Sequence, residues 1–415
     1  MRGCLFAALL IICSQIGRGQ TLKERYQESQ EAFQVKDYER YLGLTRQALQ
    51  LHPSHPELLL NEVEGLILRG REKQAYQALG RYLSWDASDR FEQKPAVDSF
   101  MRQGSFRKKL DKKLRAYSKT IRRSETFLRL AEKHHFEDIA LTPDYIILSE
   151  VNQGAVHFLS RQDHRLVAKV TLPGSALSLL VGDNGQYLYA TTSVIPQFAG
   201  YNPEQQYKSY LSQIDIGTKS VEGSLEIPGE SILGSMASNG QGTIYISDSR
   251  RPILYRVNAR NLELVQTLEI SDAFNLQGIT YNHADQKLYL ADYIKGILSL
   301  DANDLSIRKW LRSPEFLLKG IDGLSALDSR NLIGIQNNSN PMRLIRISIE
   351  ASGELKRVQL LDNDLDLGGE PTNGKLLANH AFYYIANSPW PHYDPDTHKP
   401  QPDKWQGLVI NRIQF

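Results

Sequence analysis

A two-strand unit recurs six times between Phe136 and the C-terminus, and it constrains the fold more than any other feature of the sequence. Each unit has a short apolar strand that follows a polar residue, then a turn, then a second strand that ends in small polar residues. The spacing of roughly 40 to 57 residues is the scale of a four-stranded propeller blade. The second strands are residues 145–149, 187–191, 243–248, 287–292, 331–336 and 382–387. This pattern predicts an all-β, six-bladed β-propeller over residues 124–415.

The last unit supplies three strands where a blade needs four. These strands are predicted at about 375–378, 382–387 and 407–413. We expect residues 126–131, just before the first unit, to be the fourth strand, because joining both ends of the chain in one blade leaves no unpaired strand edge. Phe127 and Leu130 would then belong to the propeller.

Residues 21–118 have a helical rather than a strand period. Tight turns are expected at 36–38 and 69–71, and apolar positions recur at an offset of about 34 residues, the tetratricopeptide period. The matched positions are Tyr41, Leu44 and Ala48, then Ala75, Ala78 and Tyr82. This stretch resembles tetratricopeptide repeats, which implies an α-helical repeat domain with a concave surface for a partner protein. Close packing of paired helices explains the same small residues without a partner.

A basic run at residues 107–115 ends the helical region. Leu110 and Leu114 lie four residues apart, which predicts a solvated helix with one buried stripe. An anionic-membrane patch is the alternative interpretation. The formal net charge of the whole chain is only +2, so the composition predicts no polyanionic partner and no nucleic-acid binding.

The N-terminus is typical of a secretory signal peptide. Residues 1–20 combine a basic start, an apolar run at 5–12 and a polar exit with small residues. We therefore expect export to the periplasm or the extracellular space. Cys4 and Cys13 both lie in this segment, so the mature chain would have no disulfide. Lipid attachment at Cys13 is the less favoured alternative, because bulky residues precede it. No later apolar stretch is long enough to span a bilayer.

Strand direction predicts where the polar side chains meet. The first strand of each blade runs along the channel from one end and the second runs back, so both present residues at one rim. Two long loops, 193–207 and 389–404, open there as a lid or binding wall. The aligned first-strand residues are Glu137, Ser178, Ser235, Gln277, Asp322 and Glu370, and the second strands supply Glu150, Asp248, Asp292, Gln336, Asn337 and Asn387.

Glu137, Asp322 and Glu370 make this rim acidic. Carboxylate and amide oxygens are hard ligands that suit Ca²⁺, and three neighbouring acids without a cation would raise one another's pKa values. We therefore expect a divalent cation, calcium in the first place, and a small polar ligand at the mouth of the channel. Polar residues at strand starts also satisfy backbone groups or hold water, which is the structural alternative.

Six segments carry a family resemblance: Phe136-Glu-Asp-Ile-Ala140, Leu276-Gln-Gly-Ile-Thr280, Leu288-Tyr-Leu-Ala-Asp-Tyr293, Ile321-Asp-Gly-Leu324, Glu370-Pro-Thr-Asn-Gly374 and Tyr383-Tyr-Ile-Ala-Asn-Ser388. Over roughly residues 125–413 the chain resembles the senescence marker protein and gluconolactonase family. The resemblance implies a six-bladed propeller with one divalent cation in the channel and hydrolysis of lactones or related esters. It implies Glu137, Gln277 and Asp322 as metal ligands, with Gln277 where the family has asparagine. The family's substrate-facing arginine and asparagine have no counterpart; Thr191, Thr192 and Ser235 stand nearby.

Two functions from different classes follow. The first is a cation-dependent lactone or ester hydrolase, with Asp322 as metal ligand and catalytic base. Its ligand-binding residues would be Glu370, Asp292, Asn337, Asn387 and Asp248. The second is a non-catalytic exported scaffold, in which the helical repeats and a propeller face bind other proteins. A fold by itself does not choose between them.

Overall fold

The computed structural model describes residues 21–87, 91, 93–313, 315–363, 365, 367–378 and 380–415. The predicted signal peptide at 1–20 lies outside the described residues. Six α-helices come first along the described chain, and 24 strands follow. The helices are α1 (Leu22–Gln34), α2 (Tyr38–Leu51), α3 (Pro56–Leu68), α4 (Glu72–Leu83), α5 (Pro95–Arg102) and α6 (Gly104–Ser118). No helix in this part of the chain is long and apolar enough to cross a membrane.

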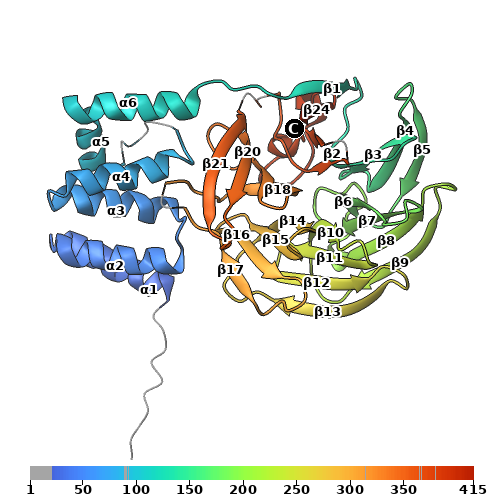
Figure 1. The fold of residues 1–415 in the computed structure, drawn as a ribbon, viewed down its shortest axis with the longest axis horizontal. Coiled ribbons are helices and arrows are strands. Elements are labelled where there is room, and N and C mark those ends of the chain that lie inside the picture. Colours follow the sequence, from blue (N-terminus) through green and yellow to red (C-terminus); the bar gives the residue numbers. More distant parts are fainter. Residues whose placement is uncertain are drawn as a thin grey trace, which may run out of the picture.

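The strands form six four-stranded sheets, which are the blades of a propeller (Figure 1). Blade 1 has β2 (Phe136–Leu141), β3 (Tyr145–Glu150), β4 (Ala155–Ser160) and β5 (Leu166–Thr171). Blade 2 has β6 (Ser175–Val181), β7 (Tyr187–Ser193), β8 (Ser209–Asp215) and β9 (Val221–Ile227). Blade 3 has β10 (Leu233–Ser238), β11 (Thr243–Asp248), β12 (Ile253–Asn258) and β13 (Glu263–Glu269). The predicted fold class is confirmed.

The remaining blades close the ring. Blade 4 has β14 (Leu276–Asn282), β15 (Lys287–Asp292), β16 (Gly296–Asp301) and β17 (Arg308–Trp310). Blade 5 has β18 (Ile321–Asp328), β19 (Asn331–Gln336), β20 (Arg343–Ile349) and β21 (Leu355–Asp362). Blade 6 has β22 (Gly374–Leu376), β23 (Ala381–Ile385), β24 (Val409–Gln414) and, from the start of the propeller, β1 (Glu125–Arg129).

Blade 6 joins the two ends of the propeller sequence, as predicted. β1 pairs antiparallel with β24, with Leu128 opposite Ile410. Phe127 and Leu130 pack on the apolar cluster shared by blades 6 and 1. In that cluster Ile385 of blade 6 and Ile139 of blade 1 are both fully buried. The propeller core therefore lies between neighbouring blades, and closing the ring removes an unpaired strand edge.

The helical domain has local signals that start and stop its helices. Thr21 and Glu24 form a capping box at α1, and the Asp37 carboxylate caps α2. The two predicted turns separate α1 from α2 and α3 from α4. Gly70 has a φ of 68° and Lys36 a φ of 60° in these turns, so each turn uses a left-handed residue. The helices share one apolar core, whereas their assignment to the tetratricopeptide family stays a prediction.

The helices lie beside blade 5, next to β20 and β21 (Figure 1). The Arg343 side chain of β20 is 1 % exposed. It donates to the backbone carbonyl of Ser84 in the helical domain and to Gln336 Oε1 in blade 5, the latter at 2.7 Å. Leu317 of the propeller belongs to the apolar core of the helices. The two parts of the chain therefore share buried polar and apolar contacts.

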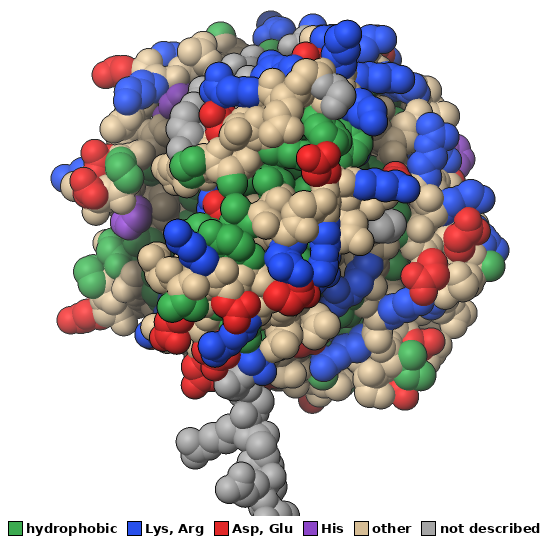
Figure 2. Space-filling view, turned by 90° about the vertical axis from the view of Figure 1, so that its left-hand side faces the viewer, with side chains coloured by type: hydrophobic (Ala, Val, Ile, Leu, Met, Phe, Trp, Pro, Cys, Tyr) green, Lys and Arg blue, Asp and Glu red, His purple; other side chains and the backbone are tan. Residues whose placement is uncertain are grey.

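The outward face of the helical domain is basic along one edge. In Figure 2, Lys and Arg side chains gather at the top of this face, over α6. Lys108, Lys109, Lys112 and Arg115 are exposed, whereas Leu110 is fully buried. This is the solvated helix with a buried leucine that the spacing predicts.

Candidate functional site

A cavity of ≈ 430 Å³ opens at the end of the channel where the first strands begin. Its volume is in the range of about 300 to 1,000 Å³ that small-molecule sites occupy. Each of the six blades contributes at least one residue in or shortly before its innermost strand, and one position of each blade can be compared with the sequence alignment. These positions are Glu137, Leu177, Gly234, Gln277, Asp322 and Glu370. The sequence alignment is therefore correct in blades 1, 4, 5 and 6, and it is one residue off in blades 2 and 3.

A backbone irregularity places five of these residues. The register between the first two strands shifts at the start of β2, β6, β10, β14 and β18. In blade 5 the shift lies between Ile321 and Leu324, so Asp322 is in the extra segment. A bulge turns a side chain out of the regular alternation of the strand. The repeated bulges thus direct one residue from each of blades 1 to 5 to the mouth of the channel.

Glycine next to two of these residues lets the inner strands approach one another. A Cβ on Gly278 would lie 2.4 Å from the Asp322 carbonyl oxygen, and a Cβ on Gly323 would lie 2.7 Å from the Thr372 carbonyl oxygen. Both distances are too short for any other residue type. Glycine therefore brings Gln277, Asp322 and the blade 6 segment close together around the axis.

All three acids of the cavity have raised pKa values. For Glu137, burial has the largest effect, repulsion from Asp322 and Glu370 adds to it, and the pKa is raised well above its usual range. Burial raises the pKa of Asp322 to about 7. Burial and then repulsion from Asp322 raise the pKa of Glu370 to about 8. Near neutral pH the acids therefore hold protons or need a cation nearby.

The three acids differ in the number of hydrogen bonds that their carboxylates accept from the protein. Glu137 Oε2 accepts hydrogen bonds from Trp390 Nε1 at 2.7 Å and from Ser388 Oγ at 2.9 Å. Asp322 Oδ2 accepts one from Asn337 Nδ2 at 2.9 Å. Within the described residues, the Glu370 carboxylate has no hydrogen-bond donor. One oxygen each of Glu137 and Asp322, and both oxygens of Glu370, therefore remain available to a ligand.

The loop after β23 forms one wall of the cavity. It holds the short helices η2 (Trp390–His392) and η3 (Pro402–Lys404). Trp390 and His398 line the cavity. The fully buried His135 anchors this wall, because its Nδ1 is 2.7 Å from the Tyr393 hydroxyl and its ring meets Trp390 edge-on at 4.5 Å. Burial lowers the pKa of His135 to about 3, so its ring is neutral.

The loop between β7 and β8 forms another wall, and apart from Gln197 the residues that line the cavity from it are mainly apolar. Ile195 is 4 % exposed and packs with Leu177 and Val151. Tyr207 and Ile232 lie against the same cluster. This loop includes the short helix η1 (Pro203–Gln205). The two long loops therefore build the predicted walls, although their chemistry differs.

Several other residues predicted at the rim have structural partners instead. Asp248 accepts backbone hydrogen bonds from Ile232, Arg250 and Arg251, and Asp292 accepts them from Ile294 and Lys295. Asn387 bridges Gly407 and Val409 across blade 6. None of the three is among the residues that line the described cavity. Their side chains hold the loops at the ends of the second strands.

Glu150 and Gln336 also have structural partners. Glu150 is contacted by His134, His157 and Lys169 at 2.6 to 3.0 Å, and these partners lower its pKa against the opposing effect of burial. Gln336 donates to two backbone carbonyls and accepts from Arg343. Asn337, by contrast, lines the cavity and links Asp322 to the Tyr293 hydroxyl, which donates to Asn337 Oδ1 at 2.9 Å.

The predicted metal ligands suit Ca²⁺ in their chemistry, because Glu137, Asp322 and Gln277 offer only oxygen ligands when an amide binds through its carbonyl. Gln277 Oε1 already accepts from Ser249 Oγ at 3.2 Å. Among the described residues, no three His, Cys, Asp or Glu side chains are grouped so that they could hold a metal ion. The predicted set has two acids and an amide. It would therefore leave several coordination positions to ligand or water.

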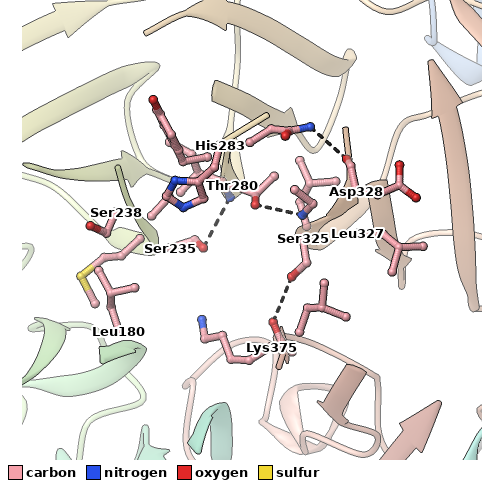
Figure 3. Close-up of a pocket in the computed structure, with 18 of the residues that line it drawn as sticks. Leu180, Ser235, Ser238, Thr280, His283, Ser325, Leu327, Asp328 and Lys375 are labelled. Atoms are coloured by element: carbon pink, nitrogen blue, oxygen red, sulfur yellow. Dashed lines mark hydrogen bonds between the residues drawn. The ribbon is translucent and has the colours of Figure 1, made fainter. Parts of the chain in front are cut away.

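A second cavity of ≈ 470 Å³ lies farther along the same inner strands. Asn373 lines both cavities. Figure 3 shows Ser235, Thr280 and Ser325 around the second cavity, each in a hydrogen bond with the backbone of a neighbouring strand. Lys375 reaches it as well, but its ammonium group is paired with the buried Asp138 at 2.9 Å. The polar groups of this cavity are largely occupied by the fold.

Three aromatic residues of the first cavity were not predicted from the sequence: Tyr207, Tyr293 and Trp390. Tyr207 and Trp390 lie in the two long loops, and Tyr293 directly follows the second strand of blade 4. Aromatic residues in rim loops are the signal that could have identified them. The positions in blades 2 and 3 were missed because Leu177 and Gly234 carry no polar group.

Comparisons with known proteins show only remote similarity to solved structures. No protein-family model and no curated protein matches. A luciferin-regenerating enzyme aligns with a TM-score of 0.49 and 12 % identity, covering 70 % of this chain and 95 % of its own. A glucose dehydrogenase aligns with the same score and identity, covering 70 % and 99 %. Hydrazine synthase of Kuenenia stuttgartiensis aligns with a TM-score of 0.45 and 12 % identity, covering 70 % and 89 %. At this distance none of them assigns a function.

Proposed function

We propose that the mouth of the propeller binds a divalent cation, calcium in the first place, together with a small ester or lactone that it hydrolyses. One observation carries the proposal: Glu137, Asp322 and Glu370, from three different blades, line one cavity with raised pKa values. Acids with perturbed pKa values in a cavity are characteristic of functional sites. A bound cation would remove their mutual repulsion.

The residues of the cavity would have distinct roles. Glu137, Gln277 and Asp322 would hold the cation, which would polarise the ester carbonyl. Asp322 is oriented by Asn337, whereas Glu370 has no protein donor among the described residues. A carboxylate with a pKa of about 8 suits proton transfer at neutral pH. We therefore add Glu370 to Asp322 as a candidate general base, which the nearby cation would keep deprotonated so that it takes a proton from the attacking water.

The proposal is tested by following δ-valerolactone hydrolysis in a pH-stat with calcium and with a chelator. We expect calcium-dependent turnover, and Glu370→Gln should lower kcat by about 100-fold or more, the usual contribution of a general base. Glu269→Gln, at an exposed glutamate on the outer strand β13, is the matched control. Calcium binding without turnover of any ester would reject the hydrolase. An absence of calcium binding would reject the cation site.

The alternative function is that of a non-catalytic exported binding protein. The six helices ahead of the propeller support it, because their exposed face in Figure 2 is not used by the cavity. Helical repeats commonly bind peptides or proteins on such surfaces. In this case the propeller would bind the cation and ligand, and the intact chain would turn over no ester.

A further inference from the structure

The polar and the apolar inner-strand residues of the cavity at the channel mouth come from different blades. Blades 4, 5, 6 and 1 contribute an amide and three acids through Gln277, Asp322, Glu370 and Glu137. Blade 2 contributes Leu177 at the equivalent bulge, and blade 3 contributes Gly234, which has no side chain. The bulges therefore present polar side chains from blades 4, 5 and 1 and none from blades 2 and 3, where the polar lining comes from loop residues Gln197 and Ser249.

The apolar side is continuous with a packed cluster. Leu177 and Ile195 are 5 % and 4 % exposed, and Ile232 and Tyr207 lie against them. The Tyr207 ring is fixed by Arg250, whose guanidinium lies 3.7 Å from the ring centroid and is paired with Glu230. A fixed apolar wall binds alkyl groups, and it leaves hydroxyl groups that touch it without hydrogen-bond partners.

The charges of the cavity restrict the polar end of a ligand. No Lys or Arg is among the described residues that line it, whereas three acids are. The nearby Arg250 is already paired with Glu230. Ligand carboxylates and phosphates would therefore meet repulsion. A neutral carbonyl group is compatible with the acidic side, particularly beside a bound cation.

We propose that the ligand is an uncharged ester or lactone with an apolar substituent, its carbonyl group on the acidic side and its substituent against Leu177, Ile195 and Tyr207. This inference rests on the proposed function and names the substrate class of that site. It favours alkyl-substituted lactones over polyhydroxylated sugar lactones and over sugar acids.

The inference is tested with γ-lactones whose side chains run from none to five carbons, and with gluconolactone. Binding to the full chain is measured by calorimetry with calcium present, and hydrolysis is followed in parallel. Burial of a methylene strengthens binding by at most about fourfold. We therefore expect affinity to rise severalfold with each added carbon until the wall is covered, and gluconolactone to bind more weakly than the longer alkyl lactones.

Two variants on the same strand sharpen the test. Leu177→Ala should flatten the dependence on chain length, whereas Leu180→Ala should preserve it, because Leu180 lines the other cavity. Affinity that does not change with chain length, or tighter binding of gluconolactone, would overturn the inference. If the longer lactones bind as expected but are not hydrolysed, the substrate class stands as a ligand class and the hydrolase fails.

Discussion

Two acids near the channel axis, Asp138 in β2 and Glu370 at the mouth, differ in how the protein compensates their charge. Asp138 is fully buried and accepts from the backbone of Ile139 and Leu179, from Ser178 Oγ and from Lys375 Nζ. Glu370, at the mouth, accepts no hydrogen bond from the described residues. A buried charge with a full set of partners supports a fold, whereas an uncompensated acid in a cavity is a candidate for ligand binding. Adjacent acids can thus have opposite roles.

The largest expected effect on stability is that of removing Asp138, whose charge is compensated by Lys375 and by hydrogen bonds. Asp138→Ala would leave Lys375 without its buried partner and three donors without an acceptor. We expect the free energy of unfolding to fall by about 3 to 5 kcal/mol, measured by urea denaturation. A loss below about 1 kcal/mol would show that Asp138 is no more structural than the acids at the mouth.

Asp322→Ala should have little effect on the fold but abolish the response to calcium. Wild-type protein should gain about 2.7 kcal/mol of stability when calcium is at 100 times its Kd, seen as a rise in Tm. Asp328→Ala, on the same strand and beside the second cavity, is the control that should keep this gain. An unchanged calcium response in Asp322→Ala would place the cation elsewhere.

In the absence of calcium, the pH dependence of folding stability should show the raised pKa of an acid at the mouth. Glu370 has a folded pKa of about 8, above its usual 4.5, so between these values the folded state binds more protons than the unfolded state. Stability should therefore fall as the pH rises through this window, by up to about 1.4 kcal/mol per pH unit for each proton retained. Denaturation of chelated protein at several pH values measures the slope. Glu370→Gln should reduce it, and an equal slope in the variant would contradict the assignment.

The smallest expected effect concerns a hydroxyl of the second cavity. Thr280 Oγ1 accepts from the backbone of Ala326 at 3.0 Å. Thr280→Val keeps the shape and removes the acceptor, so we expect a loss of about 1 kcal/mol and an unchanged calcium response. Thermal unfolding with and without calcium checks both. A change in calcium affinity would show that the two cavities act together.

The sequence predicted the blades because strand and turn patterns are local, and it predicted ring closure because a four-stranded blade must be completed. Four of the six cavity positions compared across the blades were predicted, because Glu137, Gln277, Asp322 and Glu370 carry polar groups. Ser178 and Ser235 were chosen in place of Leu177 and Gly234, because a bulge changes which residue faces the axis without changing the apolar pattern. In the structure Ser178 Oγ donates to Asp138, and Ser235 lines the other cavity.

Tertiary partners account for the other differences. Asp248 and Asp292 resemble ligand acids in sequence, but the backbone donors that occupy them come from the loops they hold. The docking of the helices on blade 5 was also not predicted. It depends on Arg343, a residue whose long-range contact with Ser84 leaves no periodic signal in the sequence.

The segment at 336–340 connects the helices to the cavity at the channel mouth. Asn337 holds Asp322, while the carbonyl of the next residue, Asn338, accepts from the Trp85 indole and Asn340 Nδ2 donates to Asp86 at 3.0 Å. A displacement of the helices would therefore act on residues one to three positions from Asn337, which donates to the Asp322 carboxylate. A propeller without residues 21–118 would lose the hydrogen bonds that Trp85 and Asp86 form with the segment next to Asn337. The isolated propeller is therefore a poor substitute for the whole chain in assays of the cavity.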